Sequence, residues 1–195
     1  MRNSMPVAHL ESEEEYFHRL DQELIEELRK RAAAEEEHRL IGEASHIADS
    51  RILERLEKLG YTHATVILLE LVPLIELAWS DGAVRSIERD RILAMAGARG
   101  VQEGTPAYEQ LLAWLEQSPS GEFFEETWHA IEREFESLPA GERELRKNGL
   151  LKACREFASA TCQHFGWATH ICAAKRKLLY EIDARLAEGH VEGRL

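Results

Sequence analysis

The stretch HATVILLELVPLIELAWS, residues 63–80, decides the fold class of this 195-residue chain. Drawn as a helix, it is apolar on nearly every face, which is typical of a helix buried at the centre of a protein. Pro73 lies inside it and predicts a kink, because proline lacks the amide hydrogen and crowds the preceding turn. We therefore expect residues 64–79 to form the most buried helix of the chain, ending at Asp81-Gly82.

The segments around this stretch also have helical patterns. Ala, Leu and Glu make up about two fifths of the chain, which favours helices over strands. Thr105-Pro106 is a typical helix start, and Ser86 is the expected N-cap of the helix that follows Gly82. The expected helices cover residues 11–45, 50–59, 64–79, 87–99, 106–117, 121–138, 142–165 and 169–187. The sequence thus predicts an all-α fold, a compact multi-helix bundle of about eight helices.

Two long segments share one pattern. Residues 63–99 and 143–187 each contain an apolar helix, a glycine-containing turn and an amphipathic helix. This pattern predicts that the bundle is built on two helical-hairpin repeats, which bury a shared core when they pack together. We expect a helical domain over residues 48–195 and, before it, an N-terminal tail with a long charged helix over residues 1–47.

The charge of the chain limits its partners. The net charge is −12, and an acidic protein repels the phosphates of nucleic acid, so we expect no nucleic-acid partner. Only the last third, residues 139–195, carries more basic than acidic groups. Its basic residues, among them Arg146 and Lys175, are expected to dock against the acidic middle of the chain or to be solvated, rather than to bind an anion.

The same features indicate a cytoplasmic protein. The longest apolar run, residues 66–79, is short and is interrupted by Glu70, Pro73 and Glu76, so we expect no transmembrane segment. The first residues contain no apolar stretch of signal-peptide length. The chain has three cysteines, and an odd count without a secretory segment suggests reduced thiols.

Residues 71–93, LVPLIELAWSDGAVRSIERDRIL, resemble the tellurite-resistance TerB-like family. The helical repeat of that family has an apolar helix that ends in Ala-Asp-Gly, then a Val or Ile, then a Glu near the start of the next helix. Here residues 78–82, Ala-Trp-Ser-Asp-Gly, end the first helix with one extra residue, and Val84 and Glu88 match the positions that follow. The likeness extends more loosely over residues 63–187. It weakens at residues 164–167, His-Phe-Gly-Trp, where a second acidic turn is expected.

The resemblance implies a function through binding. TerB-like proteins are compact helical proteins linked to tellurium-anion and other stress responses, and they also occur as modules attached to membrane-anchored or J-domain partners. An acidic surface in the family has been taken as a divalent-metal site, and no catalytic mechanism is established that could be transferred. The resemblance therefore implies a non-enzymatic protein that binds a divalent ion or a protein partner.

Asp81 and Glu88 are the candidate metal ligands. Gly82 lets the backbone turn tightly between them, and two carboxylates can converge on a hard cation such as calcium or magnesium. Glu70 is a possible third oxygen donor, eleven residues before Asp81 on the same helical face. The alternative is structural, because the same carboxylates can satisfy turn amides and the positive N-terminus of the next helix.

A zinc site is a second possibility. Cys162, His164, His170 and Cys172 form a C-x-H-x5-H-x-C cluster around the last turn, and zinc accepts two thiolates and two imidazoles. The spacing lacks the usual C-x2–4-C hook, so small core thiols and surface imidazoles are the alternative interpretation.

A di-iron site is a third possibility, since bundles of that class use Glu-x-x-His motifs on facing helices. Three of the four motifs here lie in one Glu-rich helix, which cannot face itself. The motifs are Glu15/His18, Glu35/His38, Glu43/His46 and Glu126/His129.

The helix expected over residues 11–45 carries an apolar stripe on its first half only. The stripe consists of Tyr16 or Phe17, Leu20, Leu24, Ile25 and Leu28. A long helix gains little from propensity alone, so something must cover the stripe. Self-association, a protein partner and the core of the same chain are the open alternatives, and the first would make the protein a scaffold that dimerises through residues 11–45.

Overall fold

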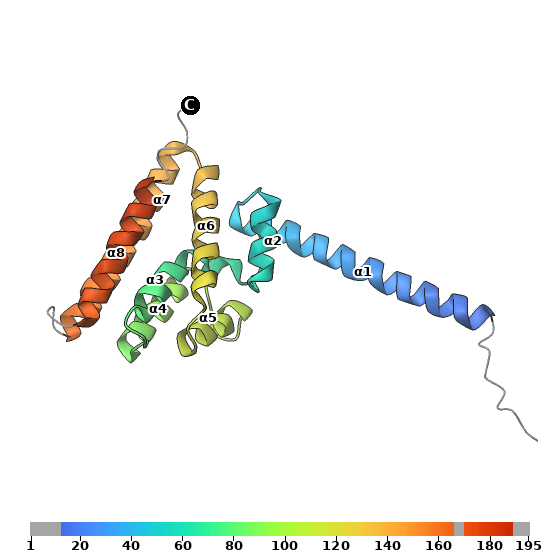
Figure 1. The fold of residues 1–195 in the computed structure, drawn as a ribbon, viewed down its shortest axis with the longest axis horizontal. Coiled ribbons are helices and arrows are strands. Elements are labelled where there is room, and N and C mark those ends of the chain that lie inside the picture. Colours follow the sequence, from blue (N-terminus) through green and yellow to red (C-terminus); the bar gives the residue numbers. More distant parts are fainter. Residues whose placement is uncertain (1–12, 166–169, 189–195) are drawn as a thin grey trace, which may run out of the picture. The chain divides into compact units, whose positions relative to one another are not determined.

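The chain is all-α, as predicted (Figure 1). A computed structural model describes residues 13–165 and 170–188, and no strand occurs in these two ranges. Within these ranges, eight α-helices and one 3-10 helix follow one another. They are α1 (Glu13–Ser45), α2 (Ser50–Lys58), η1 (Val66–Leu71), α3 (Val72–Trp79), α4 (Ser86–Ala98), α5 (Pro106–Glu116), α6 (Gly121–Ser137), α7 (Ala140–Phe165) and α8 (His170–Glu188).

The chain divides into two compact units, residues 1–37 and residues 38–195. The boundary falls inside α1. Ile41 and Ser45, in the last turns of α1, are buried and belong to the second unit. The helix therefore contributes its C-terminal end to the core of the second unit.

The centre of the second unit is α3, which contacts α4, α6, α7 and α8. Figure 1 shows α3 beside α4 and α6, with α7 and α8 forming a long hairpin. Leu71, Val72, Leu74 and Leu77 have no exposed surface, so the prediction of a central buried segment is confirmed. In the part of the chain that the structure describes, no helix is long and apolar enough to cross a membrane.

Pro73 acts differently from the prediction. Residues 66–71 form the 3-10 helix η1, and Pro73 lies in the first turn of α3. Amides in the first turn of a helix have no carbonyl acceptor within that helix, so a proline there costs no hydrogen bond. The fixed φ of proline also suits the helix. The prediction of one helix kinked at Pro73 is therefore wrong, because Pro73 starts the α-helix instead of bending it.

The start of α4 also differs from the prediction. Arg85, not Ser86, is the N-cap, and the backbone amide of Arg85 donates to Glu88 Oε2 at 2.9 Å. A glutamate at the third helical position that reaches back to the N-cap amide is one half of a capping box. By contrast, the predicted start at Thr105 is confirmed, since its hydroxyl accepts a hydrogen bond from the amide of Tyr108 at 3.3 Å.

Candidate functional site

Asp81 and Glu88, the predicted metal ligands, lie at the turn between α3 and α4. Gly82 has φ 92°, a conformation that glycine adopts at little cost, and this turn directs the chain from Asp81 into α4. The Asp81 side chain is only 2% exposed, and its Oδ2 lies 2.6 Å from Nη1 of Arg85. The same Arg85 nitrogen lies 3.8 Å from Glu88 Oε2. Arg85 therefore bridges the two carboxylates.

Glu88 has a second cationic partner on α8. Lys175 Nζ lies 2.9 Å from Glu88 Oε1, and neither side chain has any exposed surface. Two carboxylates and two cations thus balance one another at this turn. Of the two alternatives left open for the basic residues of the last third, docking against the acidic middle holds for Lys175. We call Asp81, Arg85, Glu88 and Lys175 the buried charge cluster.

Three buried oxygens of the buried charge cluster accept no hydrogen bond, and two of them, Asp81 Oδ2 and Glu88 Oε1, lie in the ion pairs with Arg85 and Lys175. Asp81 Oδ1 is buried and accepts no hydrogen bond. A buried acceptor of this kind is costly unless another group satisfies it. An ion that bound there would have to move the guanidinium of Arg85 away from Asp81. In the described ranges of the chain, no group of three or more His, Cys, Asp or Glu side chains is arranged to hold a metal ion.

Glu70, considered above as a third ligand, belongs to a different cluster. It forms an ion pair with Arg146 of α7 and lies 4.0 Å from Arg99. Arg146 also lies 3.7 Å from Glu134 of α6. These four side chains line a cavity of about 190 Å³. Glu70 therefore contributes to a contact between η1, α6 and α7 instead of facing Asp81.

Glu134 is the titratable group in this cluster that sequence reasoning missed. It is 6% exposed, and burial raises the pKa of its carboxyl to about 7, helped by the nearby charge of Glu70 and opposed by Arg146. Glutamates are common on this helix, so the residue type alone gave no signal. A signal existed in the spacing, because Glu134 follows Thr127 by seven residues and Ile131 by three, on the buried face of α6.

The cysteines do not match the prediction of reduced thiols. Cys162 of α7 and Cys172 of α8 form a disulfide, with their Cα atoms 5.5 Å apart. Cys154 is a buried free thiol, and burial raises its pKa to about 12, with a further contribution from Glu76. In the disulfide form the two sulfurs of the proposed zinc cluster bind each other. The side chains of His164 and His170 lie outside the part of the chain that the structure describes.

Histidines and glutamates of the Glu-x-x-His motifs have partners outside their motifs. Nδ1 of His38 lies 2.8 Å from Glu57 Oε1, and Arg55 donates a hydrogen bond to Glu126 at 3.0 Å. His129 lies 3.5 Å from Glu132, which is not part of its motif. The described side chains therefore give no support to a di-iron arrangement.

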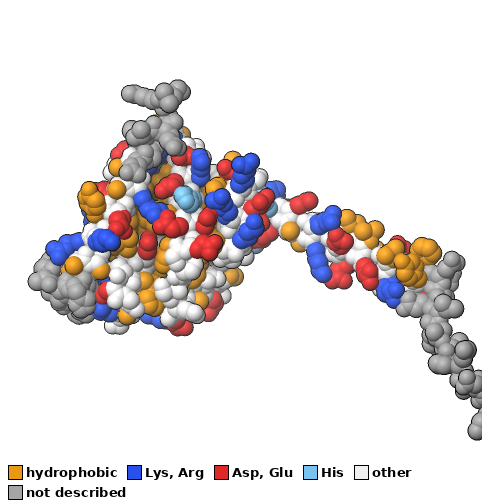
Figure 2. Space-filling view, viewed as in Figure 1, with side chains coloured by type: hydrophobic (Ala, Val, Ile, Leu, Met, Phe, Trp, Pro, Cys, Tyr) orange, Lys and Arg blue, Asp and Glu red, His pale blue; other side chains and the backbone are white. Residues whose placement is uncertain are grey.

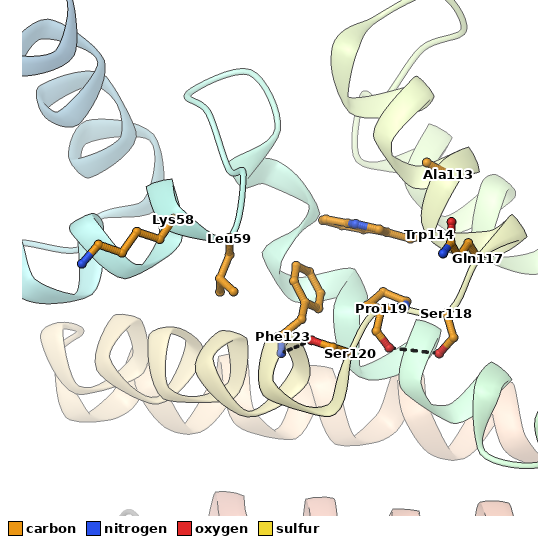
Figure 3. A pocket seen from close by; sticks show the side chains of 9 residues that line it. All are labelled: Lys58, Leu59, Ala113, Trp114, Gln117, Ser118, Pro119, Ser120 and Phe123. Carbon is orange, nitrogen blue, oxygen red and sulfur yellow. Dashed lines mark hydrogen bonds between the residues drawn. The ribbon is translucent and has the colours of Figure 1, made fainter.

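An open groove of about 400 Å³ lies between the ends of α2 and α5 and the start of α6. Figure 3 shows the rings of Trp114 and Phe123 next to each other in this groove, with Leu59 and Pro119 on either side. The two ring centroids are 4.9 Å apart, and both rings also contact Tyr61. Lys58 is the only charged residue among those that line the groove. The groove therefore combines an apolar part with the polar side chains of Gln117, Ser118 and Ser120.

The first half of α1 carries a row of exposed apolar side chains, and Figure 2 shows them gathered along this helix. They are 48–57% exposed: Tyr16, Phe17, Leu20, Leu24, Ile25 and Leu28. We call these six residues the apolar stripe. Other large exposed apolar side chains in the described ranges, at Ile67, Leu145 and Tyr180, are scattered over three elements.

No family model, no curated protein and no solved structure matches the chain. The resemblance of residues 71–93 to TerB-like proteins stays a prediction from the sequence.

Proposed function

We propose that this chain is a non-enzymatic binding protein that associates through the apolar stripe of α1. The observation that carries the proposal is the exposure of six large apolar side chains in one row. Single exposed apolar residues are normal on a protein surface, but contiguous ones are typical of interaction sites. Their removal from water supplies about 25 cal/mol per Å² of apolar surface, which is the driving force for association.

The local sequence stabilises the helix that carries the stripe and gives the stripe the spacing of a helix-packing face. Lys30 Nζ lies 3.0 Å from Glu26 Oε1, and Arg31 Nη2 lies 2.6 Å from Glu27 Oε1. Each of these ion pairs joins side chains one helical turn apart. Such pairs each stabilise a helix by about 0.2–0.5 kcal/mol. The stripe follows the i, i+3, i+4, i+7 spacing with which one helix packs against another.

The occupant that we propose for the stripe is α1 of a second copy of the chain. Sedimentation equilibrium of the full chain tests this, together with a Leu24→Glu variant and a matched Leu145→Glu control. Leu145 is 73% exposed and lies outside the stripe, on α7. We expect the wild type and the control to self-associate, and Leu24→Glu to stay monomeric with unchanged helix content. A wild type that is monomeric at every concentration overturns self-association.

Divalent-ion binding at Asp81 and Glu88 is the second candidate function. The observation that favours it is the buried Asp81 Oδ1, which accepts no hydrogen bond. Calcium or magnesium bound at this oxygen would displace the guanidinium of Arg85 from the neighbouring Oδ2, and the affinity is expected to be modest because Arg85 and Lys175 already neutralise the carboxylates. Calorimetry of the metal-free protein tests this, since binding must disappear in Asp81→Asn. The absence of binding heat in the wild type contradicts it.

The wider biological role rests on the sequence resemblance. The match of residues 71–93 to the TerB-like repeat supports a part in a tellurite or other stress response, and we place that activity in the cytoplasm. Cells that lack the protein should then be more sensitive to tellurite, and the Asp81→Asn variant should fail to restore resistance if ion binding is the activity. Unchanged sensitivity contradicts the tellurite role.

A further inference from the structure

The cavity between η1, α6 and α7 has an apolar wall and a charged wall. The apolar wall consists of Ala44, Val66, Ile67 and Leu69, and the charged wall of Glu70, Arg99, Glu134 and Arg146. Such a mixture is typical of small-molecule sites, because apolar surface supplies affinity and a few charged groups fix the orientation of the ligand. The volume of about 190 Å³ suits a molecule of a few heavy atoms, since one water molecule takes about 30 Å³ in the liquid.

The charged wall is neutral overall when both carboxyls are ionised. Arg146 forms an ion pair with Glu70 and lies 3.7 Å from Glu134. Arg99 Nε lies 4.0 Å from Glu70 Oε2. A ligand with a net charge would leave that charge uncompensated in a partly buried site, which is costly. The wall therefore favours a ligand that is neutral overall.

Glu134 can accept further hydrogen bonds from a ligand. Its side chain is only 7% exposed, and no group in the described ranges donates a hydrogen bond to its carboxyl. The 3.7 Å between its Oε1 and Nη1 of Arg146 is longer than a hydrogen bond. A buried carboxylate is costly unless donors reach it, and an ammonium group supplies donors together with the opposite charge.

Arg99 can donate further hydrogen bonds to a ligand. Its Nη1 donates to the carbonyl of Met95 at 3.1 Å, which holds the guanidinium against the end of α4. Its Nε and Nη2 donate to no other group that the structure describes, and Glu70 is too far from Nε for a hydrogen bond. These two nitrogens form one edge of the guanidinium, and such an edge binds a carboxylate through two parallel hydrogen bonds.

We propose that this cavity binds a small aliphatic α-amino acid as its zwitterion, with the carboxylate on Arg99, the ammonium on Glu134 and the side chain against the apolar wall. Such a molecule is neutral overall and supplies both kinds of group that the charged wall leaves without hydrogen bonds. The ion pair between Glu70 and Arg146 stays as it is. The proposal does not depend on the apolar stripe of α1.

Binding should release protons. Near pH 7 the carboxyl of Glu134 is partly protonated, because burial raises its pKa to about 7, helped by Glu70 and opposed by Arg146. Arg99, at the end of α4, and His46, after α1, also line the cavity. An ammonium group binds the ionised carboxylate, so the ligand expels the proton, and its affinity should rise from pH 6 to pH 8. A simple anion would favour the protonated carboxyl and would take up protons instead.

Calorimetric titration of the full chain with alanine tests the proposal. Propionate and ethylamine serve as matched probes, because each carries only one of the two charged groups. We expect alanine to bind and each single-charge probe to bind at least about tenfold more weakly. Titrations at pH 7 in two buffers with different heats of ionisation should show proton release. No binding of alanine up to about 10 mM overturns the proposal. Propionate that binds as tightly as alanine, with proton uptake, also overturns it and indicates an anion site.

Variants assign the two charged groups. Glu134→Gln and Arg99→Gln should each weaken the binding of alanine at least about tenfold, and Glu134→Gln should also abolish the proton release. The matched controls are Glu136→Gln, on the exposed side of α6, and Arg89→Gln, whose partner Glu116 lies outside the cavity. Both controls should bind alanine as the wild type does, and circular dichroism checks that every variant is folded. Binding that survives Glu134→Gln in a folded protein overturns the proposal.

Discussion

Lys175 Nζ on α8 lies 2.9 Å from Glu88 Oε1 on α4, and both side chains are fully buried. The contact joins two helices that are far apart in the sequence. A buried ion pair gains little over apolar residues of the same size, but removal of one partner leaves a charge without compensation. The pair therefore makes the docking of α8 dependent on Glu88, whatever else the turn at Asp81 does.

The first prediction follows from this pair. Lys175→Met should lower the free energy of unfolding by about 3–5 kcal/mol, because it leaves Glu88 buried without its cation. The measurement is urea denaturation at neutral pH. The double variant Lys175→Met with Glu88→Gln should recover part of the loss, since it removes both charges. A loss below about 1 kcal/mol in the single variant would show that the pair is not buried in solution.

The second prediction concerns pH and Glu134. Its pKa is raised to about 7 in the folded protein, so between the unfolded value near 4.5 and pH 7 the folded state binds more protons than the unfolded state. The contribution of Glu134 to the free energy of unfolding therefore falls as the pH rises through that window. Urea denaturation from pH 5 to 8 measures this slope.

Glu134→Gln keeps the size of the side chain and removes its titration. We expect the variant to lose the slope and to be more stable than the wild type at pH 8, by about 1–3 kcal/mol. Glu136→Gln, on the exposed side of the same helix, is the control and should keep the slope. Equal slopes in the wild type and Glu134→Gln would contradict the raised pKa.

The third prediction tests the central position of α3. Leu74 has no exposed surface, so Leu74→Ala should cost about 2–5 kcal/mol. Leu145→Ala, at a site that is 73% exposed, should change stability by less than about 0.5 kcal/mol. Equal melting temperatures for Leu74→Ala and the wild type would show that α3 is not the core.

The fourth prediction concerns the disulfide. The bond joins Cys162 and Cys172, which are ten positions apart in the sequence, and its reduction should lower stability by about 2–3 kcal/mol. In unfolded protein without reductant, an alkylating reagent should modify Cys154 alone, and mass spectrometry counts the modifications. Three modified cysteines would show that the bond does not form.

Local rules predicted much of the fold. The helical segments follow from apolar periodicity, and the start at Thr105 follows from a hydroxyl before a proline. The two local errors have a common cause, because each depends on where a helix begins. Pro73 is compatible with a first turn as well as with a kink, and the preceding 3-10 helix decides between them.

The candidate site depended on contacts that no local pattern contains. The sequence shows a turn motif formed by Asp81, Gly82 and Glu88. It also shows that Arg85 lies inside this motif. Lys175 was visible only as one residue of a basic segment, since its partner is 87 positions away. The disulfide was equally hidden, because sequence spacing does not fix which cysteines meet.

The mass of the full-length chain in solution tests the central claim most directly. The chain has a mass of 22.3 kDa, and we expect sedimentation equilibrium to give a mass that rises with concentration towards twice this value. The Leu24→Glu variant should remain at the mass of one chain, because it places a charge in the middle of the apolar stripe. A wild-type mass of one chain at all concentrations up to about 100 μM would contradict association through α1 with an affinity in the micromolar range.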